Sequence, residues 1–171
     1  MTHKVIRIIS IVFGLGLLAL LAFAFSPGSG RPLQGDPAPG LSLVPFDGSE
    51  VSLSDLRGQV VVLNFWASWC TPCRREAPEL QKVWEMYEGK GVVFVGVSHK
   101  DAEDASRSFI QEFGITYPNG ADLRSKISRA YGVTAVPETF VIDAEGRVAW
   151  VYIGEVQADD LVRRLAQMVA R

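Results

Sequence analysis

The sequence predicts an α/β domain, because apolar, β-branched runs alternate with helical patterns along residues 41–171. A largely apolar, β-branched run over 60–65 predicts a buried strand, and a helical pattern follows it from residue 71. A second apolar run, over 92–97, predicts another buried strand. The net charge of −2 gives no electrostatic case for nucleic-acid binding. We therefore expect one α/β domain whose function does not depend on a basic, nucleic-acid-binding surface.

The first 25 residues predict a membrane segment. Residues 1–7 hold Lys4 and Arg7, and residues 8–25 are apolar apart from Ser10. With the two preceding apolar residues this run reaches about 20, enough to cross a bilayer as a helix. The basic side predicts that 1–7 is cytoplasmic, that 8–25 is a single-pass anchor in the cell membrane, and that the rest is extracytoplasmic. A cleaved signal peptide is the alternative, since 22–24 (Ala-Phe-Ala) fits a cleavage site, and it gives the same compartment.

Residues 26–40 are rich in Pro, Gly and Ser, which predicts a tether between the anchor and a domain over 41–171. Two short alternating runs, 41–44 and 50–53, flank Asp47-Gly48 and predict a small hairpin. A polar turn over 54–58 then leads into the strand at 60–65.

The only two cysteines, Cys70 and Cys73, lie between that strand and the following helix. Pro72 suits a first helical turn, and apolar residues recur at helical spacing downstream (Ala77, Leu80, Val83, Trp84 and Tyr87). The unpaired N–H groups of a helix N-terminus favour a thiolate and lower its pKa. We expect Cys70 to be the more exposed nucleophile and Cys73 to be the shielded thiol that resolves a mixed disulfide.

Two other uses of the cysteine pair are less consistent with the sequence. A zinc site needs about four ligands, and His3 and His99 are the only histidines. A structural disulfide over so short a loop would constrain the unfolded chain little. We interpret the pair as a working redox couple, without a metal or a cofactor.

The remaining elements follow in order. Gly89 and Gly91 end the first helix, and 101–113 has helical periodicity with Asp101 available as a cap. A further short helix is predicted over 123–131. Two strands, 139–142 and 148–153, flank a turn at 143–146, and an amphipathic helix over 158–169 closes the domain.

The string over 63–78, LNFWASWCTPCRREAP, resembles the thioredoxin superfamily, and in particular its membrane-anchored branch, the TlpA, ResA and CcmG (DsbE) proteins. The resemblance extends over about residues 36–170. It implies a thioredoxin-like fold, a central mixed sheet flanked by helices, with the N-terminal hairpin and a central insertion that contains 101–113.

The resemblance also implies where a client binds. The string 133–140 matches the segment in which these proteins carry a cis proline against the cysteine pair, which places Pro137 there. A proline at that point leaves the preceding backbone free to pair with an extended peptide. The expected client contacts are Trp69, Thr71, Pro72, Val136, Pro137 and Glu138. For Glu138 a solvated position at the start of a strand remains equally open.

Glu76 is the second candidate for chemistry, three residues after Cys73. It is either an acid that only complements the helix dipole or a group that moves a proton on and off the resolving thiol. Thioredoxins of the cytoplasmic type carry an acid where this chain has Asn64, which cannot titrate. Glu76 matches the position of an active-site glutamate in ResA-like proteins, so we predict a catalytic role.

Three further expectations concern neighbouring side chains. Trp66 is predicted to be a core residue, and His99 a lone surface histidine. Arg74 and Arg75 either assist the thiolate or form a solvated helix face.

The resemblance implies an anchored thiol-disulfide oxidoreductase that reduces protein disulfides in an oxidising compartment. It implies an apocytochrome c, with its CxxCH cysteines, as client, and a membrane electron donor of the CcdA or DsbD kind. One alternative is a thiol oxidant or oxidoreductase of broad range, since CTPC does not fix the direction of electron flow. A Sco-like copper metallochaperone is another alternative. Those proteins carry a CxxxC motif and a histidine late in the chain, whereas this chain has CxxC and no histidine after His99. A peroxidase of the peroxiredoxin type is disfavoured by the WCTPC string.

Overall fold

A computed structural model describes residues 6–7, 13–16 and 30–169. Residues 1–5 of the predicted basic end (1–7), 8–12 and 17–25 of the predicted anchor (8–25), and 26–29 of the predicted tether (26–40) lie outside the described residues. Within the described residues, no helix has both the length and the apolar character needed to cross a membrane. The anchor and its orientation therefore stay predictions.

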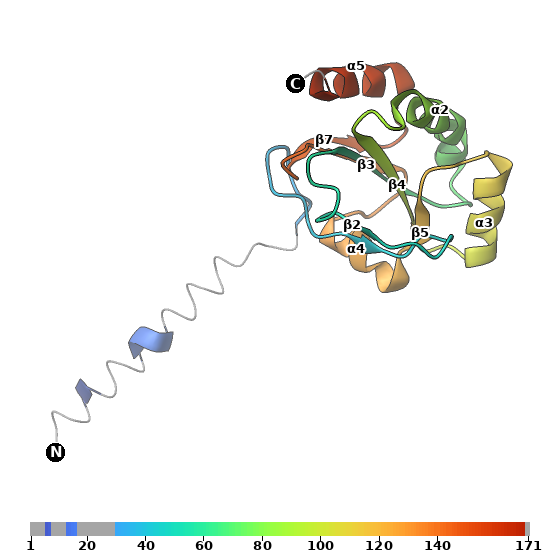
Figure 1. The fold of residues 1–171 in the computed structure, drawn as a ribbon. Helices are drawn as coiled ribbons and strands as arrows, with labels where there is room; N and C mark the ends of the chain where they lie inside the picture. Colours follow the sequence, from blue (N-terminus) through green and yellow to red (C-terminus); the bar gives the residue numbers. More distant parts are fainter. Residues whose placement is uncertain (1–5, 8–12, 17–29, 170–171) are drawn as a thin grey trace.

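The core of the fold is a five-stranded mixed sheet (Figure 1). Its order is β5 (Asn119–Ala121), β4 (Val92–Ser98), β3 (Val60–Trp66), β6 (Glu138–Ile142) and β7 (Val148–Ile153). The first three strands are parallel to one another, whereas β6 runs antiparallel to β3 and β7 antiparallel to β6. All of β3 is buried, as its apolar, β-branched run predicted, and Asn64 is the one polar residue in it.

Each face of the sheet has its own apolar layer. Val62 and Trp66 of β3 point to the face covered by α2 (Thr71–Tyr87), α5 (Ala158–Val169) and the apolar side of α3 (Glu103–Glu112). Leu63 and Phe65 point to the other face, which is covered by the hairpin of β1 (Ser42–Leu43) and β2 (Val51–Ser52) and by α4 (Lys126–Ala130). This alternation follows from the two-residue period of a strand. It confirms the predicted thioredoxin-like α/β architecture and places α2 directly after the central strand.

The predicted elements are found close to their expected bounds. The closing helix is confirmed at Ala158–Val169, and the late hairpin is confirmed with β6 beginning one residue early. The helix predicted over 123–131 is divided into a 3-10 turn, η1 (Leu123–Ser125), and α4. The division lies at Arg124 and Ser125, whose φ angles of 58° and 53° are left-handed and interrupt the helix. The Asp122 carboxylate then accepts free backbone N–H groups at the start of α4, from Ile127 at 2.9 Å and Ser128 at 2.8 Å.

The segment expected to be a tether, 26–40, lies against the domain over part of its described length. Gly35 N donates to Val148 O at 2.8 Å, and Val148 N donates to Asp36 O at 2.9 Å. The side chain of Arg31 reaches Glu138 at the start of β6. Its Pro- and Gly-rich composition indicated a free linker, but the backbone groups of 35–38 have partners beside β7 and its turn. The packed unit therefore begins before residue 41.

Candidate active site

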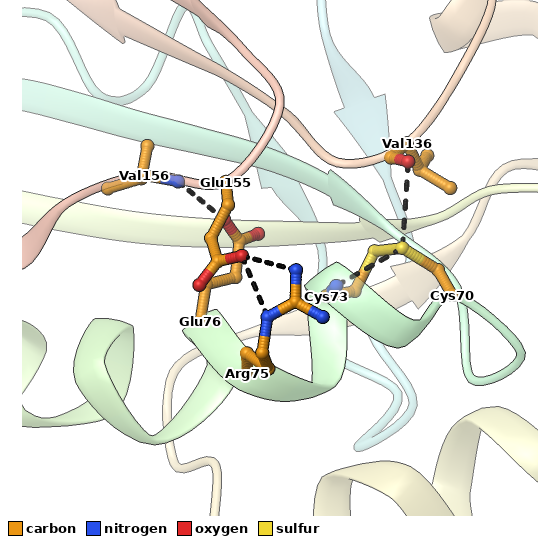
Figure 2. A network of polar contacts seen from close by, with 7 residues as sticks. All are labelled: Cys70, Cys73, Arg75, Glu76, Val136, Glu155 and Val156. Carbon is orange, nitrogen blue, oxygen red and sulfur yellow. Dashed lines mark hydrogen bonds and ion pairs between the residues drawn. A yellow bond between two sulfur atoms is a disulfide. The ribbon is translucent and has the colours of Figure 1, made fainter.

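Cys70 and Cys73 form a disulfide at the N-terminus of α2. Cys70 is the N-cap residue, with φ −86° and ψ 108°, and Cys73 N donates to Cys70 Sγ at 3.2 Å (Figure 2). Pro72 lies in the first turn, where it removes no helical hydrogen bond. When the disulfide is reduced, the same N–H group and the helix dipole favour a thiolate on Cys70. The local structure is therefore the one that the sequence pattern predicted.

The two sulfur-bearing residues differ in access. Cys70 is 4% exposed and Cys73 is 1% exposed, so both are buried in the disulfide form and Cys70 is the outer one. Trp69, 61% exposed, and the exposed Thr71 flank Cys70 on the surface, and Pro72 is half-buried beside them. These residues form the rim across which a client disulfide would reach Cys70.

The Val136–Pro137 peptide bond is cis, as the resemblance implied. The carbonyl oxygen of Val136 lies 3.5 Å from Cys70 Sγ (Figure 2). Pro137 is buried and Val136 is half-buried. The loop before β6 and the N-terminus of α2 thus meet at Cys70, although they are 66 residues apart.

Asp101 fixes the loop that leads into the cysteine pair, a role that sequence reasoning missed. Its carboxylate accepts hydrogen bonds from Ser68 N at 2.7 Å and Ser68 Oγ at 2.9 Å. It also accepts from Ser106 Oγ of α3 at 3.0 Å. The predicted capping role is wrong, because Ala102 is the N-cap residue of α3 and that end has no side-chain cap. Spacing alone gave no sign that Ser68 and Asp101 meet.

Glu76 is buried at 2% exposure, one turn after Cys73 on the same side of α2. Its Oε1 accepts from Asn64 Nδ2 at 3.0 Å, and its Oε2 accepts from Val156 N at 2.9 Å (Figure 2). Burial raises the pKa of Glu76 to about 7; the two hydrogen bonds oppose the rise and the charge of Glu155 adds to it. A carboxyl group with this pKa can both accept and donate a proton near neutral pH. Glu76 is therefore not merely a surface acid beside the helix dipole.

Asn64 of β3 holds the Glu76 side chain through the hydrogen bond from its Nδ2. Its Nδ2 also donates to Thr139 Oγ1 of β6 at 2.9 Å, and the residue is 2% exposed. The amide thus connects the central strand, α2 and β6. It positions Glu76 without titrating itself.

Glu138 is buried at 1% exposure, so the alternative of a solvated residue at the start of β6 is wrong. Arg31 pairs with it through two contacts, Nη1 to Oε2 at 2.7 Å and Nη2 to Oε1 at 2.9 Å. In the sheet register Glu138 is opposite Phe65, whose side chain lies on the face away from α2. A direct contact between Glu138 and a client would require this pair to open.

His99 is buried at 4% exposure, and the expectation of a surface histidine is wrong. Its Nδ1 lies 2.7 Å from Ser128 Oγ, and Ser128 Oγ donates its only hydrogen to the Asp122 carboxylate. Nδ1–H of His99 is therefore the donor to Ser128. Burial lowers the pKa of His99, and the charge of Lys100 lowers it further. The imidazole, directly after β4, is therefore a neutral, buried side chain with a structural role.

The remaining residues near the pair have other partners. Trp66 is confirmed as a core residue, stacked on Phe109 with its Nε1 donating to Asn119 Oδ1 at 2.8 Å. Arg74 lies over the Phe113 ring and pairs with Glu112 of α3. Arg75 donates from Nε and Nη2 to Glu155 Oε2, at 3.0 and 2.7 Å (Figure 2). Among the described residues no group of three or more His, Cys, Asp or Glu side chains is arranged to hold a metal ion.

Comparison with known sequences is consistent with this geometry. A family model described as the AhpC/TSA family matches residues 34–151. The thiol-disulfide oxidoreductase ResA of Geobacillus kaustophilus is 36% identical over 131 residues, which are 77% of this chain and 75% of that protein. ResA of Bacillus thuringiensis is 34% identical over 127 residues, 74% of this chain and 73% of that protein.

Solved structures of similar shape are also redox proteins. A thiol:disulfide interchange protein of the thioredoxin family from Chlorobium tepidum aligns with a TM-score of 0.73 and 32% identity, over 82% of this chain and 98% of that one. A secreted disulfide oxidoreductase of Mycobacterium tuberculosis, homologous to E. coli DsbE, aligns with a TM-score of 0.68 and 26% identity, over 74% and 95% of the two chains.

Proposed function

The chain belongs to the AhpC/TSA family of thioredoxin-like proteins and is a ResA- and DsbE-like thiol-disulfide oxidoreductase; on that basis we propose that it reduces protein disulfides outside the cytoplasm. The observation that carries the proposal is the Cys70–Cys73 disulfide at a helix N-terminus, with the Val136 carbonyl beside Cys70 and the buried Glu76 one turn after Cys73 on α2.

The reaction transfers two electrons from the cysteine pair to the client. In the reduced protein, the Cys70 thiolate attacks one sulfur of the client disulfide, and the other client sulfur leaves as a thiolate. Cys73 gives its thiol proton to Glu76, and its thiolate then attacks Cys70 Sγ. The mixed disulfide breaks, the second client thiolate leaves, and the Cys70–Cys73 bond forms.

The client binds in this proposal as an extended segment across the rim made by Trp69, Thr71 and Pro72. The backbone of Val136, held in place by the cis bond to Pro137, supplies the main-chain partner. Such recognition depends mostly on backbone and exposed apolar surface, and it fits an unfolded protein better than a small molecule.

The client we propose is an apocytochrome c, whose CxxCH cysteines must be free thiols before haem is attached. The electron donor we propose is a membrane protein of the CcdA or DsbD kind, and the anchor is the apolar segment 8–25. These three assignments are supported by the resemblance to the anchored TlpA, ResA and CcmG proteins. A reductant is needed where the surroundings oxidise cysteines.

The test is the midpoint reduction potential of the Cys70–Cys73 couple in the full-length chain. Equilibration against dithiothreitol or glutathione, followed by the fluorescence of Trp66 and Trp69, measures it. A potential near that of thioredoxin, about −270 mV, is expected for a dedicated reductant. A potential near that of DsbA, about −120 mV, would make the protein a thiol oxidant instead.

A further inference from the structure

The proton that Glu76 takes from Cys73 must be transferred to bulk solvent in each catalytic cycle. Cys73 is 1% exposed and Glu76 is 2% exposed, so neither can give a proton directly to bulk water. The net reduction of a client disulfide nevertheless removes a proton from the Cys73–Glu76 pair in every cycle. A second site must therefore connect Glu76 with the surface.

A small surface cavity of about 250 Å³ reaches Glu76 from outside. It lies between α2 on one side and the loop 154–157, which joins β7 to α5, with the start of α5 on the other. Arg75, Glu76 and Glu155 are among its lining residues. The backbone N–H of Val156, which donates to Glu76 Oε2, belongs to the same loop. The cavity thus ends at the carboxyl group that is proposed to carry the proton.

The Arg75–Glu155 ion pair lies at this opening (Figure 2). Arg75 contributes two donors to one carboxylate oxygen of Glu155, and the two side chains are 57% and 30% exposed. Glu155 directly precedes the residue that binds Glu76, so its charge is held close to that carboxyl group. The pair therefore combines a fixed negative charge near Glu76 with a positive charge that compensates it.

We propose that the Arg75–Glu155 pair lines the proton path between Glu76 and solvent and sets the proton affinity of Glu76. Both are positioning residues, because they act through Glu76 and touch neither cysteine nor client. The proposal rests on the proposed function of Glu76 as the proton carrier for Cys73.

The charges that face Glu76 from its other neighbours do not change this conclusion. Asn64, which donates to Glu76, is uncharged. Burial raises the pKa of Tyr117, and the charge of Glu76 raises it further, so this phenol stays neutral. Glu79 of α2 also lines the cavity and is paired with Lys82, and Asp159 of α5 lines it as well. Arg75 is the one cation among the lining residues. Its removal would leave only acids around the opening.

The experiment measures the titration midpoint of Glu76 in the oxidised full-length chain, from the ¹³C shift of its carboxyl carbon, assigned with Glu76→Gln. Glu155→Gln should lower the midpoint by about 0.5 pH units, and Arg75→Gln should raise it by about the same amount. The pH profile for reduction of a disulfide-bonded CxxCH peptide should move in the same two directions. Arg75→Lys, which keeps the charge, should return the midpoint to the wild-type value.

Arg74 and Glu112 are the matched control, since Arg74 directly precedes Arg75 on α2 and its ion pair with Glu112 of α3 does not line the cavity. Arg74→Gln and Glu112→Gln make the same charge changes and should move the midpoint much less. Equal shifts in the two sets, or shifts of one sign for both Arg75→Gln and Glu155→Gln, would overturn the proposal. If Glu76→Gln itself keeps the wild-type pH profile, the proton-carrier role of Glu76 fails, and the proposal fails with it.

Discussion

At the scale of single residues, the two cysteines differ in what surrounds them. Cys70 is the N-cap residue with the Val136 carbonyl beside it, whereas Cys73 is enclosed by the first turn of α2 and lies one turn before Glu76. The first can be reached by a client sulfur, and the second can be reached only by Cys70. This asymmetry assigns attack to Cys70 and release to Cys73.

Replacing Cys73 should therefore trap the client. In Cys73→Ser, reduced Cys70 attacks a disulfide-bonded CxxCH peptide but nothing releases it, so the mixed disulfide should accumulate and turnover should fall by at least about 100-fold. Mass spectrometry of the non-reduced mixture measures the adduct. Cys70→Ser is the control and should form none. Turnover by Cys73→Ser at the wild-type rate would contradict the assignment.

Glu76 should make the stability of the protein depend on pH. Its pKa of about 7 lies above the ordinary value of 4.5, so the folded chain holds a proton that the unfolded chain has lost. The associated stability is fully present below pH 4.5 and is lost as pH rises through 7. Relative to Glu76→Gln, wild type should lose on the order of 3 kcal/mol of unfolding free energy between pH 4.5 and 7.5.

Urea denaturation of both proteins at several pH values measures this difference. Glu79→Gln, at a half-exposed position of the same helix, should follow wild type. Parallel curves for wild type and Glu76→Gln would mean that folding does not change the pKa of Glu76.

The sequence predicted the residues whose role is set by neighbours along the chain. Cys70, Cys73 and Trp66 were identified because a strand, a turn and a helix N-terminus follow one another there. The expectations for His99 and Asp101, and the solvated alternative for Glu138, were wrong because the surroundings of these residues come from distant segments: Ser128 for His99, Ser68 for Asp101, and Arg31 for Glu138. Composition and periodicity give no information about such pairs.

At the scale of elements, the junction of β3, β4 and β5 depends on Gly96. A Cβ atom at this position would lie 1.7 Å from Asn119 Oδ1 and 2.9 Å from Trp66 Nε1. The Trp66–Asn119 hydrogen bond occupies that space, and it joins the strand before the cysteine pair to β5. A side chain on Gly96 would force these two residues apart.

We expect Gly96→Ala to destabilise the domain by about 2 kcal/mol, because the crowding leaves the buried Trp66 and Asn119 groups without their hydrogen bond. Thermal or urea unfolding measures the effect. Gly40→Ala is the control, since a Cβ there would meet nothing within 4 Å. Equal stability of the two variants would show that β5 can shift without cost.

Helices and strands with a clear hydrophobic pattern in their own sequence were predicted, and those without one were missed. The closing helix has a full amphipathic period and was found at its expected residues. β5, with the sequence Asn-Gly-Ala, was not predicted, because it has no β-branched or aromatic residue. It is a strand because the end of β4 offers it a parallel partner at Gly96–Ser98, and Phe46 N donates to Asn119 O at 2.7 Å on its other side.

At the scale of the whole molecule, the Arg31–Glu138 pair connects the N-terminal docked segment to the start of β6. Glu138 is 1% exposed and Arg31 24% exposed at their side chains, so the loss of one partner leaves a charge with little access to water. Residues 107 apart in the chain thereby become one unit.

Arg31→Met should lower the unfolding free energy by about 2 kcal/mol, since it leaves the Glu138 carboxylate unpaired. The double variant Arg31→Met/Glu138→Gln should be more stable than Arg31→Met, because the buried charge is gone. Arg57→Met is the control, since Arg57 is an exposed arginine that donates to the backbone oxygen of Glu145. If the double variant were as unstable as the sum of the single changes, the two residues would not be coupled.

The docking of residues 31–38 also limits where the protein can work. If the proposed anchor ends at Phe25, the chain between the bilayer and the first docked residue is only 26–30, which spans at most about 18 Å when fully extended. The whole domain, with its cysteine pair, would then be confined to the layer of solvent next to the lipid, no deeper than this span plus the diameter of the domain. Substrates would have to come to that layer, as chains do when they emerge from a translocation channel or wait at a membrane-bound ligation machinery.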